Sequence, residues 1–297
     1  MLEVDTTYTS ALAAQARFRL SRQTAQDADS LRRMTVVRRD AGDASDLDVD
    51  LATVTAGQQL NLAAGDSLAY MSMLFTVQTL MGMPADSVTI VLADSLSLAV
   101  APARSGEGDV VSSNGAAALG AVPSVAAAEA SVQAAELAVT RERRSMWGVP
   151  SLQLGVEWGD PSNDPKNKAL PLIGISLPVP ILNRNQGPIA QAEADRDRAR
   201  AELSVARLEA RQRLAEGLRE LASLLVQVAR DQDLVVRAGR VAAKSLTAYR
   251  EGASALPAVL EARRTAREVL GQYIDDLAAL LIVDAELRAL TQTAPTP

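Results

Sequence analysis

The chain of 297 residues contains neither cysteine nor histidine, and aromatic residues make up only 3% of it. Without cysteine it forms no disulfide and offers no thiol nucleophile, and without histidine it lacks the commonest general base and transition-metal ligand. No apolar run reaches the roughly 18 residues that a transmembrane helix needs. The net charge of −6 argues against nucleic acid as a partner. We therefore expect a protein that is not an enzyme and has no cofactor and no metal site.

The residues that are present favour long helices. Hydrophobic residues make up 48% of the chain, and they are mostly alanine, leucine and valine, which let helices approach closely. Helical periodicity covers 4–39, 47–80, 123–144, 188–250 and 257–290. At about 1.5 Å per residue, the longest of these helices would extend on the order of 90 Å. We therefore expect a mainly α-helical protein of long antiparallel coiled-coil hairpins. The seam of the longest helix is predicted to contain Ala192, Ala199, Leu203, Ala206, Ala210, Leu214, Leu218, Leu221, Leu225 and Val228.

Two helix breaks have the same pattern. Gly42 and Gly252 each suit the left-handed position past a helix end, and Ser45 or Asp46 can cap the helix that follows the first break. When Gly42 is aligned with Gly252, the returning helices match without a gap, which indicates an internal duplication. The matched pairs are Val49 with Val259, Ala52 with Ala262 and Leu80 with Leu290.

The duplication predicts three segments. Residues 1–83 form a first helical hairpin whose start is missing, and 84–121 form a linker segment. Residues 122–297 form the second repeat, with a feeder helix (122–146), a β-hairpin (151–180) and a long helical hairpin (188–290). Because the first repeat has no feeder helix or β-hairpin, we expect the chain to be truncated at its N-terminus. We expect a signal peptide to have been lost with them, since the first residues have neither a basic region nor an apolar core.

One β-hairpin is predicted between the helices. Strict alternation over 151–158 puts Leu152, Leu154, Val156 and Trp158 on one face and Ser151, Gln153, Gly155 and Glu157 on the other. A second strand follows the loop 159–168, with Ile173, Ile175, Leu177 and Val179 on its apolar face. Such strands fit a half-buried sheet in a soluble core, and they also have the length of strands that cross a bilayer. A solitary hairpin has no sheet to join within its own chain, which favours a sheet completed by other subunits.

Three motifs carry a resemblance to a known family. They are Ile175 to Gly187 entering Ala190 to Ala194, Tyr249 to Gly252 with Val259 to Ala262, and Gly42 to Ser45 with Asp48, Val49 and Ala52. With these motifs the chain resembles the TolC-like outer-membrane efflux family, in particular its heavy-metal-efflux-type branch.

The resemblance implies a TolC-like duct, a homotrimer in the outer membrane of a Gram-negative-type bacterium. Each chain would give β-hairpins to a shared barrel in the lipid and helical hairpins to a periplasmic tunnel, with 84–121 around its middle. The duct would passively export metal ions or small toxic compounds, coupled through a periplasmic adaptor to an inner-membrane pump. Ser151, Gln153 and Glu157 would face the lumen. Asn183, Arg184, Asn185 and Gly187 would form the junction between barrel and tunnel.

The resemblance also assigns roles at the helix tips. Gly42, Asp43, Asp48 and Gly252 become candidate adaptor contacts, although turn and capping chemistry also explains the acidic residues. Glu261 matches an acidic position that rings the aperture in the family, whereas the neighbouring acidic position is Ala258 in this chain. The alternative for Glu261 is a solvated helix face beside Arg263 and Arg264.

Two metal-binding interpretations and two further functions are alternatives. Met71, Met73, Met81 and Met83 carry thioethers that suit copper, but methionine near the end of an apolar helix is more typical of core packing. The aspartates around Gly42 lack the glycine and terminal glutamate of an EF-hand loop. The alternatives to a duct are a soluble periplasmic coiled-coil scaffold and a non-functional fragment of an efflux protein.

Overall fold

The computed structural model describes residues 2–84, 90–96, 122–145, 151–158, 169–176 and 185–291. They form α1 (Leu2–Asp40), α2 (Asp46–Leu80), α4 (Pro123–Ser145), β1 (Ser151–Trp158), β2 (Ala169–Ser176), α5 (Gln186–Arg250) and α6 (Leu256–Thr291). The helices agree with the predicted ranges to within a few residues at each end. None of the described helices is both long and apolar enough to cross a membrane.

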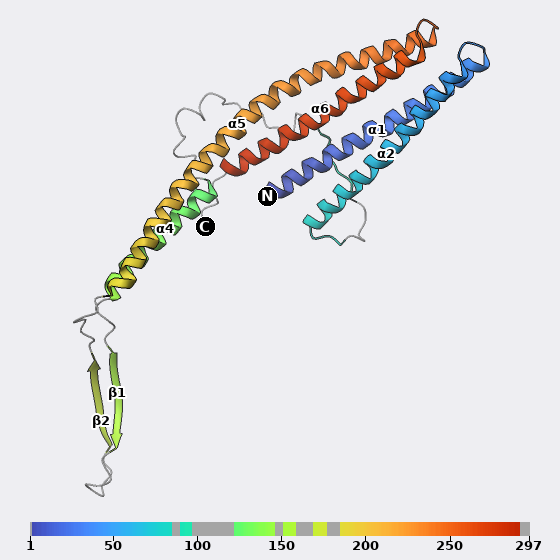
Figure 1. Cartoon of the computed structure of the whole chain (residues 1–297). Coiled ribbons are helices and arrows are strands. Elements are labelled where there is room, and N and C mark those ends of the chain that lie inside the picture. Colours follow the sequence, from blue (N-terminus) through green and yellow to red (C-terminus); the bar gives the residue numbers. More distant parts are fainter. Residues whose placement is uncertain are drawn as a thin grey trace. The chain divides into compact units, whose positions relative to one another are not determined.

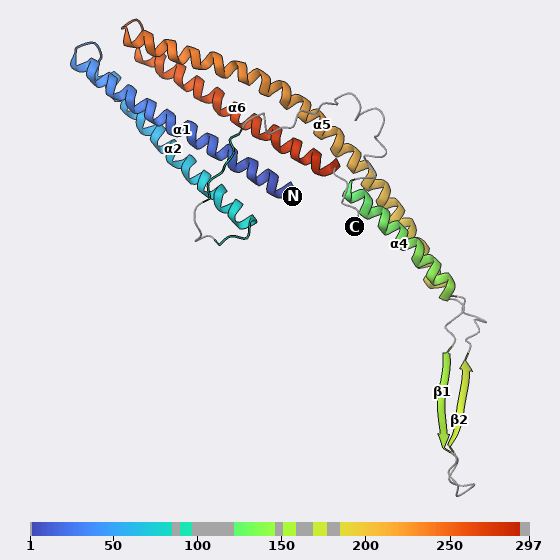
Figure 2. The ribbon, with the colours of Figure 1, turned by 180° about the vertical axis from the view of Figure 1, so that it is seen from behind.

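The chain divides into two compact units. The first unit comprises Met1–Ser113 and Arg213–Gln292, and the second comprises Asn114–Gln212 and Thr293–Pro297. Helix α5 contributes to both units, because the boundary lies between Gln212 and Arg213. The predicted second repeat, 122–297, is therefore divided between the two units. In the first unit α1 runs back along α2 and α5 runs back along α6, as both views show (Figures 1 and 2). Helix α1 also packs against α6.

The two helical turns have one geometry. Gly42 has φ 85° and Gly252 has φ 78°, which are the left-handed conformations expected for both. In the first turn the Gly42 amide donates to the Arg39 carbonyl at 2.8 Å and the Asp43 amide donates to the Arg38 carbonyl at 2.7 Å. The second turn repeats this pattern in register, since Gly252 donates to Tyr249 at 3.1 Å and Ala253 donates to Ala248 at 2.8 Å. The predicted register of the repeat at the two tips is confirmed.

The two turns differ in how the next helix begins. Ser45 is the N-cap of α2: its hydroxyl accepts from the Asp48 amide at 3.1 Å, and the Asp48 carboxylate accepts from the Ser45 amide at 3.1 Å. This is a capping box with aspartate in the third position. Ala255 and Ala258 occupy the equivalent positions before and within α6. Of the two predicted caps, Ser45 is therefore correct and Asp46 is not.

The apolar core of the first unit lies in clusters along the helices. Near the tips, one cluster joins all four helices through the buried residues Leu31, Ala52, Tyr249, Leu256 and Val259. Further along α5 and α6, Val228, Leu277, Leu280 and Leu281 form another cluster, against which Leu224 packs.

The predicted seam of α5 is wrong at Leu225, which is 38% exposed. Leu224 takes its place, because the spacing from Leu221 to Val228 is compatible with either residue and the packing of α6 selects between them.

In the second unit, α4 lies antiparallel to the first part of α5 (Figure 1). Three ion pairs cross between the helices: Arg207 with Glu129 at 2.8 Å, Arg200 with Glu136 at 2.6 Å, and Arg143 with Glu193 at 2.6 Å. The partners advance by one heptad on each helix, which is the repeat of a coiled coil. Val125 and Val139 are buried on α4, and Ala192, Ala199 and Ala210 are buried on α5. The feeder helix and the long helix therefore form a regular two-helix coiled coil.

The β-hairpin pairs antiparallel, with Leu152 opposite Ile175, Leu154 opposite Ile173 and Val156 opposite Pro171. Residues directly opposite one another share a face, so the predicted apolar face is confirmed over these pairs. Strand β2 begins at Ala169, directly after the predicted loop 159–168, and Ala169 pairs with Trp158. The predicted strand positions Leu177 and Val179 lie outside the described residues.

We predict that Gly42→Ala lowers the free energy of unfolding by about 1–2 kcal/mol, because an L residue is strained in the left-handed region. A β-carbon at Gly42 would meet nothing within 4 Å, so the effect would come from the backbone alone. The matched control is Gly239→Ala inside α5, where a β-carbon also meets nothing within 4 Å. That change should stabilise by about 0.5–1 kcal/mol. Denaturant titration followed by helical circular dichroism measures the free energy of unfolding of both variants. Equal changes in the two variants would contradict a required left-handed conformation at Gly42.

Candidate functional site

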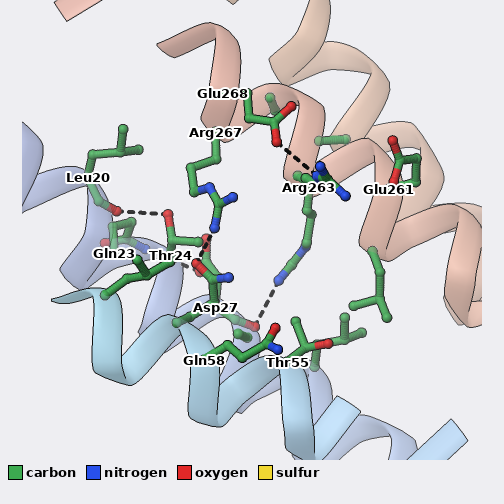
Figure 3. A pocket seen from close by; sticks show the side chains of 18 of the residues that line it. Leu20, Gln23, Thr24, Asp27, Thr55, Gln58, Glu261, Arg263, Arg267 and Glu268 are labelled. Carbon is green, nitrogen blue, oxygen red and sulfur yellow. Dashed lines mark hydrogen bonds and ion pairs between the residues drawn. The ribbon is translucent and has the colours of Figure 1, made fainter. Parts of the chain in front are cut away.

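A groove with a volume of about 1220 Å³ opens near the helix tips of the first unit. Residues of α1, α2, α5 and α6 line it, so both hairpins of the unit contribute to its walls (Figure 3). Its apolar lining includes Leu31, Leu51, Leu246 and Leu260, while Gln58, Asp66 and several charged residues of α6 supply polar walls. An apolar floor with a polar rim suits a helical protein segment better than a small ion.

Two arginines of α6 reach across the groove to the first hairpin. Arg263 Nη1 donates to the Asp27 carbonyl of α1 at 2.8 Å, and Arg267 Nη1 donates to Gln59 Oε1 of α2 at 2.6 Å. Figure 3 shows both side chains extending from α6 toward the helices of the first hairpin. Burial lowers the pKa of the Arg263 guanidinium, Asp27 opposes this change, and Arg250 adds to it. Arginine keeps its charge despite such a shift, so Arg263 is a half-buried cation that joins α6 to α1 across the groove.

Glu261 lines the same groove and is exposed. Its charge helps to raise the pKa of Arg264, although the larger causes are the hydrogen bond and the charge of Glu268. Arg264 Nε donates to Glu268 Oε1 at 2.8 Å. Within one chain, Glu261 therefore has the surroundings of a solvated helix face beside an arginine. The aperture ring needs the same residue from other copies and stays a prediction.

Arg38 and Tyr249 connect the two helical turns, and sequence analysis missed this role. Arg38 Nη1 donates to the Tyr249 carbonyl, and the guanidinium carbon lies 4.5 Å from the centre of the Tyr249 ring. The Tyr249 hydroxyl lies 3.3 Å from Thr35 Oγ1, and Tyr249 is only 3% exposed. The rarity of tyrosine in this chain, and its place in the motif Tyr249 to Gly252, were signals in the sequence.

The structure places the other predicted tip residues at the two turns. Gly42 and Gly252 provide the left-handed conformations, and Asp48 is explained by the capping box. Asp43 is exposed, and its backbone carbonyl accepts from Arg38 Nη2 at 3.4 Å. Asp43 therefore has an exposed carboxylate that takes no part in the capping box, unlike Asp48.

Asn185 connects the start of α5 to the end of α4. Its backbone has φ 59°, a left-handed conformation that asparagine tolerates. Its side-chain amide donates to the Glu142 carbonyl at 3.0 Å, to Glu142 Oε2 at 3.1 Å and to Ser145 Oγ at 2.8 Å. The pKa of Glu142 is lowered, first by the hydrogen bond from Arg141 and then by that from Asn185. Gly187 is exposed in the first turn of α5, whereas Asn183 and Arg184 lie outside the described residues.

The predicted lumen-facing residues lie on one face of the hairpin. Ser151 is opposite Ser176 and Gln153 is opposite Gly174. The backbone of Glu157 shares that face, but its side chain lies outside what the structure describes. The face becomes apolar toward the hairpin loop, since Leu172 lies opposite Gly155.

The methionines near the end of α2 do not form one packed group. Met73 packs against the cluster that includes Ala11, Leu12 and Leu74, as a core role predicts. The core interpretation is wrong for Met81, which is 61% exposed, and for Met71, which is 37% exposed. Among the described residues, no group of three or more Asp, Glu, His or Cys side chains is placed to hold a metal ion.

We predict that Asn185→Ala frees the end of α4 from the start of α5. The change removes the contacts of the amide with Glu142 and Ser145 and strains the backbone, at a cost of about 1–3 kcal/mol. Asn185→Gly is the matched control, because it removes the same bonds but accepts φ 59° without strain. Hydrogen exchange of the last turn of α4 and the first turn of α5 measures the effect. Unchanged protection in Asn185→Ala would contradict this role.

No curated protein matches the chain in sequence. Solved structures match its fold. The outer membrane protein VceC from Vibrio cholerae has a TM-score of 0.76 at 16% identity, covering 98% of this chain and 69% of VceC. The outer-membrane channel OprN has a TM-score of 0.81 at 18% identity, covering 99% and 66%. The MtrE outer membrane channel of Neisseria gonorrhoeae has a TM-score of 0.73 at 14% identity, covering 98% and 66%.

The chain thus spans about two thirds of the length of the solved structures that it matches. A family model described as "Outer membrane efflux protein" matches residues 116–292, which is more than half of the chain. That match includes the coiled coil of α4 and α5, the β-hairpin, the second turn and α6. The fold agrees with the TolC-like architecture expected from the motifs. The chain belongs to the outer membrane efflux protein family.

Proposed function

We propose that this chain is one subunit of a passive, trimeric exit duct that crosses the outer membrane and the periplasm. The duct would serve as the outer component of a tripartite efflux system. In that system an inner-membrane pump supplies the energy and a periplasmic adaptor protein connects the pump to the helix tips. Conduction through such a duct needs a polar lumen and a gate, and it needs no catalytic group.

The observation that carries the proposal is the exposed apolar face of the β-hairpin. Leu152, Leu154, Ile173 and Ile175 are between 64% and 73% exposed within their own chain. A two-stranded hairpin is at best marginally stable alone in water. Strands of other copies would complete the sheet, and lipid would cover the apolar face. The alternative of a soluble scaffold, in which the hairpin packs against helices, leaves these side chains unexplained.

The helices support association of several copies. Helix α2 carries apolar side chains that its own chain leaves exposed, and Leu47, Leu60 and Leu68 are each between 65% and 73% exposed. Large apolar side chains left exposed in number commonly mark a protein interface. In the proposed trimer, neighbouring copies would cover this surface and the hairpins would line a tunnel. Ser151, Gln153 and Glu157 would then face the lumen, and Glu261 would ring the aperture.

The groove of the first unit supports coupling to an adaptor. It lies between the helices that the turns at Gly42 and Gly252 connect. Leucines form part of its lining, and Arg263 and Arg267 cross it. Asp43 and Asp48 lie at the turn of the first hairpin, and this position supports them as proposed adaptor contacts. An amphipathic helix of an adaptor would bury an apolar face there while its polar residues meet the rim.

The proposed cargo is metal ions or small toxic compounds. The heavy-metal-efflux-type motifs favour metal ions, and a duct passes its cargo without a dedicated metal site. Asn183, Arg184, Asn185 and Gly187 would form the junction at which barrel strands become tunnel helices, and Asn185 would hold that junction together.

The first test combines assembly with transport. The protein purified from membranes is expected to need detergent and to run as a trimer, because both the hairpin face and α2 expose apolar surface. A strain lacking the gene is expected to become sensitive to metal salts or to organic toxicants, and the gene in trans should restore resistance. A chain that is soluble and monomeric without detergent would refute the duct, as would a deletion strain with unchanged resistance to both classes.

Single cysteines test the adaptor groove, because the chain has no cysteine of its own. Gln58→Cys and Asn61→Cys, both at exposed positions of the groove, would carry a photoactivatable maleimide reagent in intact cells. We predict that both capture a periplasmic adaptor identified by mass spectrometry. Ser223→Cys, on an exposed position of α5 outside the groove, is the matched control. Equal capture at all three positions, or capture only at Ser223→Cys, would refute docking in the groove.

A further inference from the structure

Two aspartates lie buried between α5 and α6, outside the groove and outside the proposed lumen. Asp231 on α5 is 8% exposed and Asp276 on α6 is 7% exposed. They lie beside the apolar cluster of Val228, Leu277, Leu280 and Leu281. Two ionised carboxylates side by side in such surroundings repel each other and lose hydration. Neither residue has a part in the duct described above.

The hydrogen bonds around the pair are unequal. Asp276 Oδ2 accepts from the Gln227 side chain at 2.7 Å, and Asp276 Oδ1 accepts from the Gln272 side chain at 2.9 Å. Asp231 Oδ2 is buried without a hydrogen-bond partner among the described residues. Asp276 thus has two amide donors, whereas the buried Oδ2 of Asp231 has none. The proton of the pair therefore belongs on Asp231, which can donate it toward Asp276.

The surrounding charges do not neutralise the pair. Burial is the largest cause that raises the pKa of Asp231, followed by the interaction with the neighbouring Asp276 carboxyl, while Arg230 on α5 opposes them. Next to Asp276, Asp275 is already paired with Arg17 of α1. In the segment 90–96, whose Leu96 packs on the same cluster, Asp94 accepts from the Tyr8 hydroxyl at 2.8 Å. Further along α6, Asp284 is paired with Arg288.

We propose that Asp231 and Asp276 form a proton-sharing carboxyl pair that joins α5 to α6 while it holds a proton and loosens this contact when the proton leaves. The site would bind one proton, and the long helical hairpin would become less stable at this level as the pH rises.

The direction follows from linkage. The pKa of Asp231 is raised in the folded chain, so the folded state binds the proton more tightly than the unfolded state does. The stabilisation is fully present below the unfolded pKa, about 3.9, and is lost as the pH rises through the folded pKa. This dependence is opposite to that of a carboxylate in an ion pair, whose stabilising effect is lost as the pH falls. The inference does not rest on the proposed duct, because it concerns contacts within one hairpin.

The test uses the whole chain in detergent and compares the wild type with Asp231→Asn. An asparagine amide can donate to Asp276 at every pH and so imitates the protonated state. As the pH rises above the unfolded pKa of about 3.9, the wild-type melting temperature should fall by about 2–4 °C more than that of Asp231→Asn. Asp233→Asn removes the same charge from an exposed ion pair with Arg237, and it should keep the wild-type slope.

Infrared spectroscopy provides a second readout that a purely structural role would not change. The wild type should show a protonated-carboxyl band that titrates above the unfolded pKa of about 3.9, and Asp231→Asn should lack that band. The proposal is overturned if the band is absent from the wild type, or if the two proteins have the same pH slope. It is also overturned if calcium or magnesium chloride at about pH 8 stabilises the wild type but not Asp231→Asn, because a cation rather than a proton would then neutralise the pair.

Discussion

The register of the long helices depends on two left-handed turns. Gly42 and Gly252 adopt φ 85° and 78° and reverse the chain through the same hydrogen-bond pattern. A helix turns by about 100° per residue, so a shift of one residue at a tip would rotate the apolar stripe of the returning helix away from its partner. The cluster of Leu31, Tyr249, Leu256 and Val259 draws on both hairpins, and it therefore depends on both turns.

Charged residues act differently in the two units. In the second unit the ladder between α4 and α5 consists of exposed pairs, each of which contributes only about 0.2–1 kcal/mol. Their regular spacing favours one alignment of the helices more than it adds stability. In the first unit Arg263 is half-buried and donates to a backbone carbonyl, and Arg38 covers the ring of Tyr249. These contacts join the two hairpins near the helix tips.

Much of the fold was predictable because it depends on local patterns. The helix limits follow from periodicity, the turns from glycine, and the paired faces of the hairpin from strict alternation. The errors have a common origin in packing. Leu224 and Leu225 fit the helical period equally well, and only the position of α6 decides which one is buried. Met71 and Met81 are apolar residues of a type common in protein cores, yet their side chains are exposed.

The candidate site was predictable only in part. By itself the sequence determined the family motifs, the helical hairpins and the residues of the turns, because short-range chemistry specifies each of them. Only the tertiary structure decided that Arg38 meets Tyr249, that Arg263 and Arg267 cross a groove, and that Asp231 lies beside Asp276. These partners come from helices far apart in the chain. Which side chains meet is set by the rotation and register of whole helices, and that depends on the sum of many weak apolar contacts rather than on any local pattern.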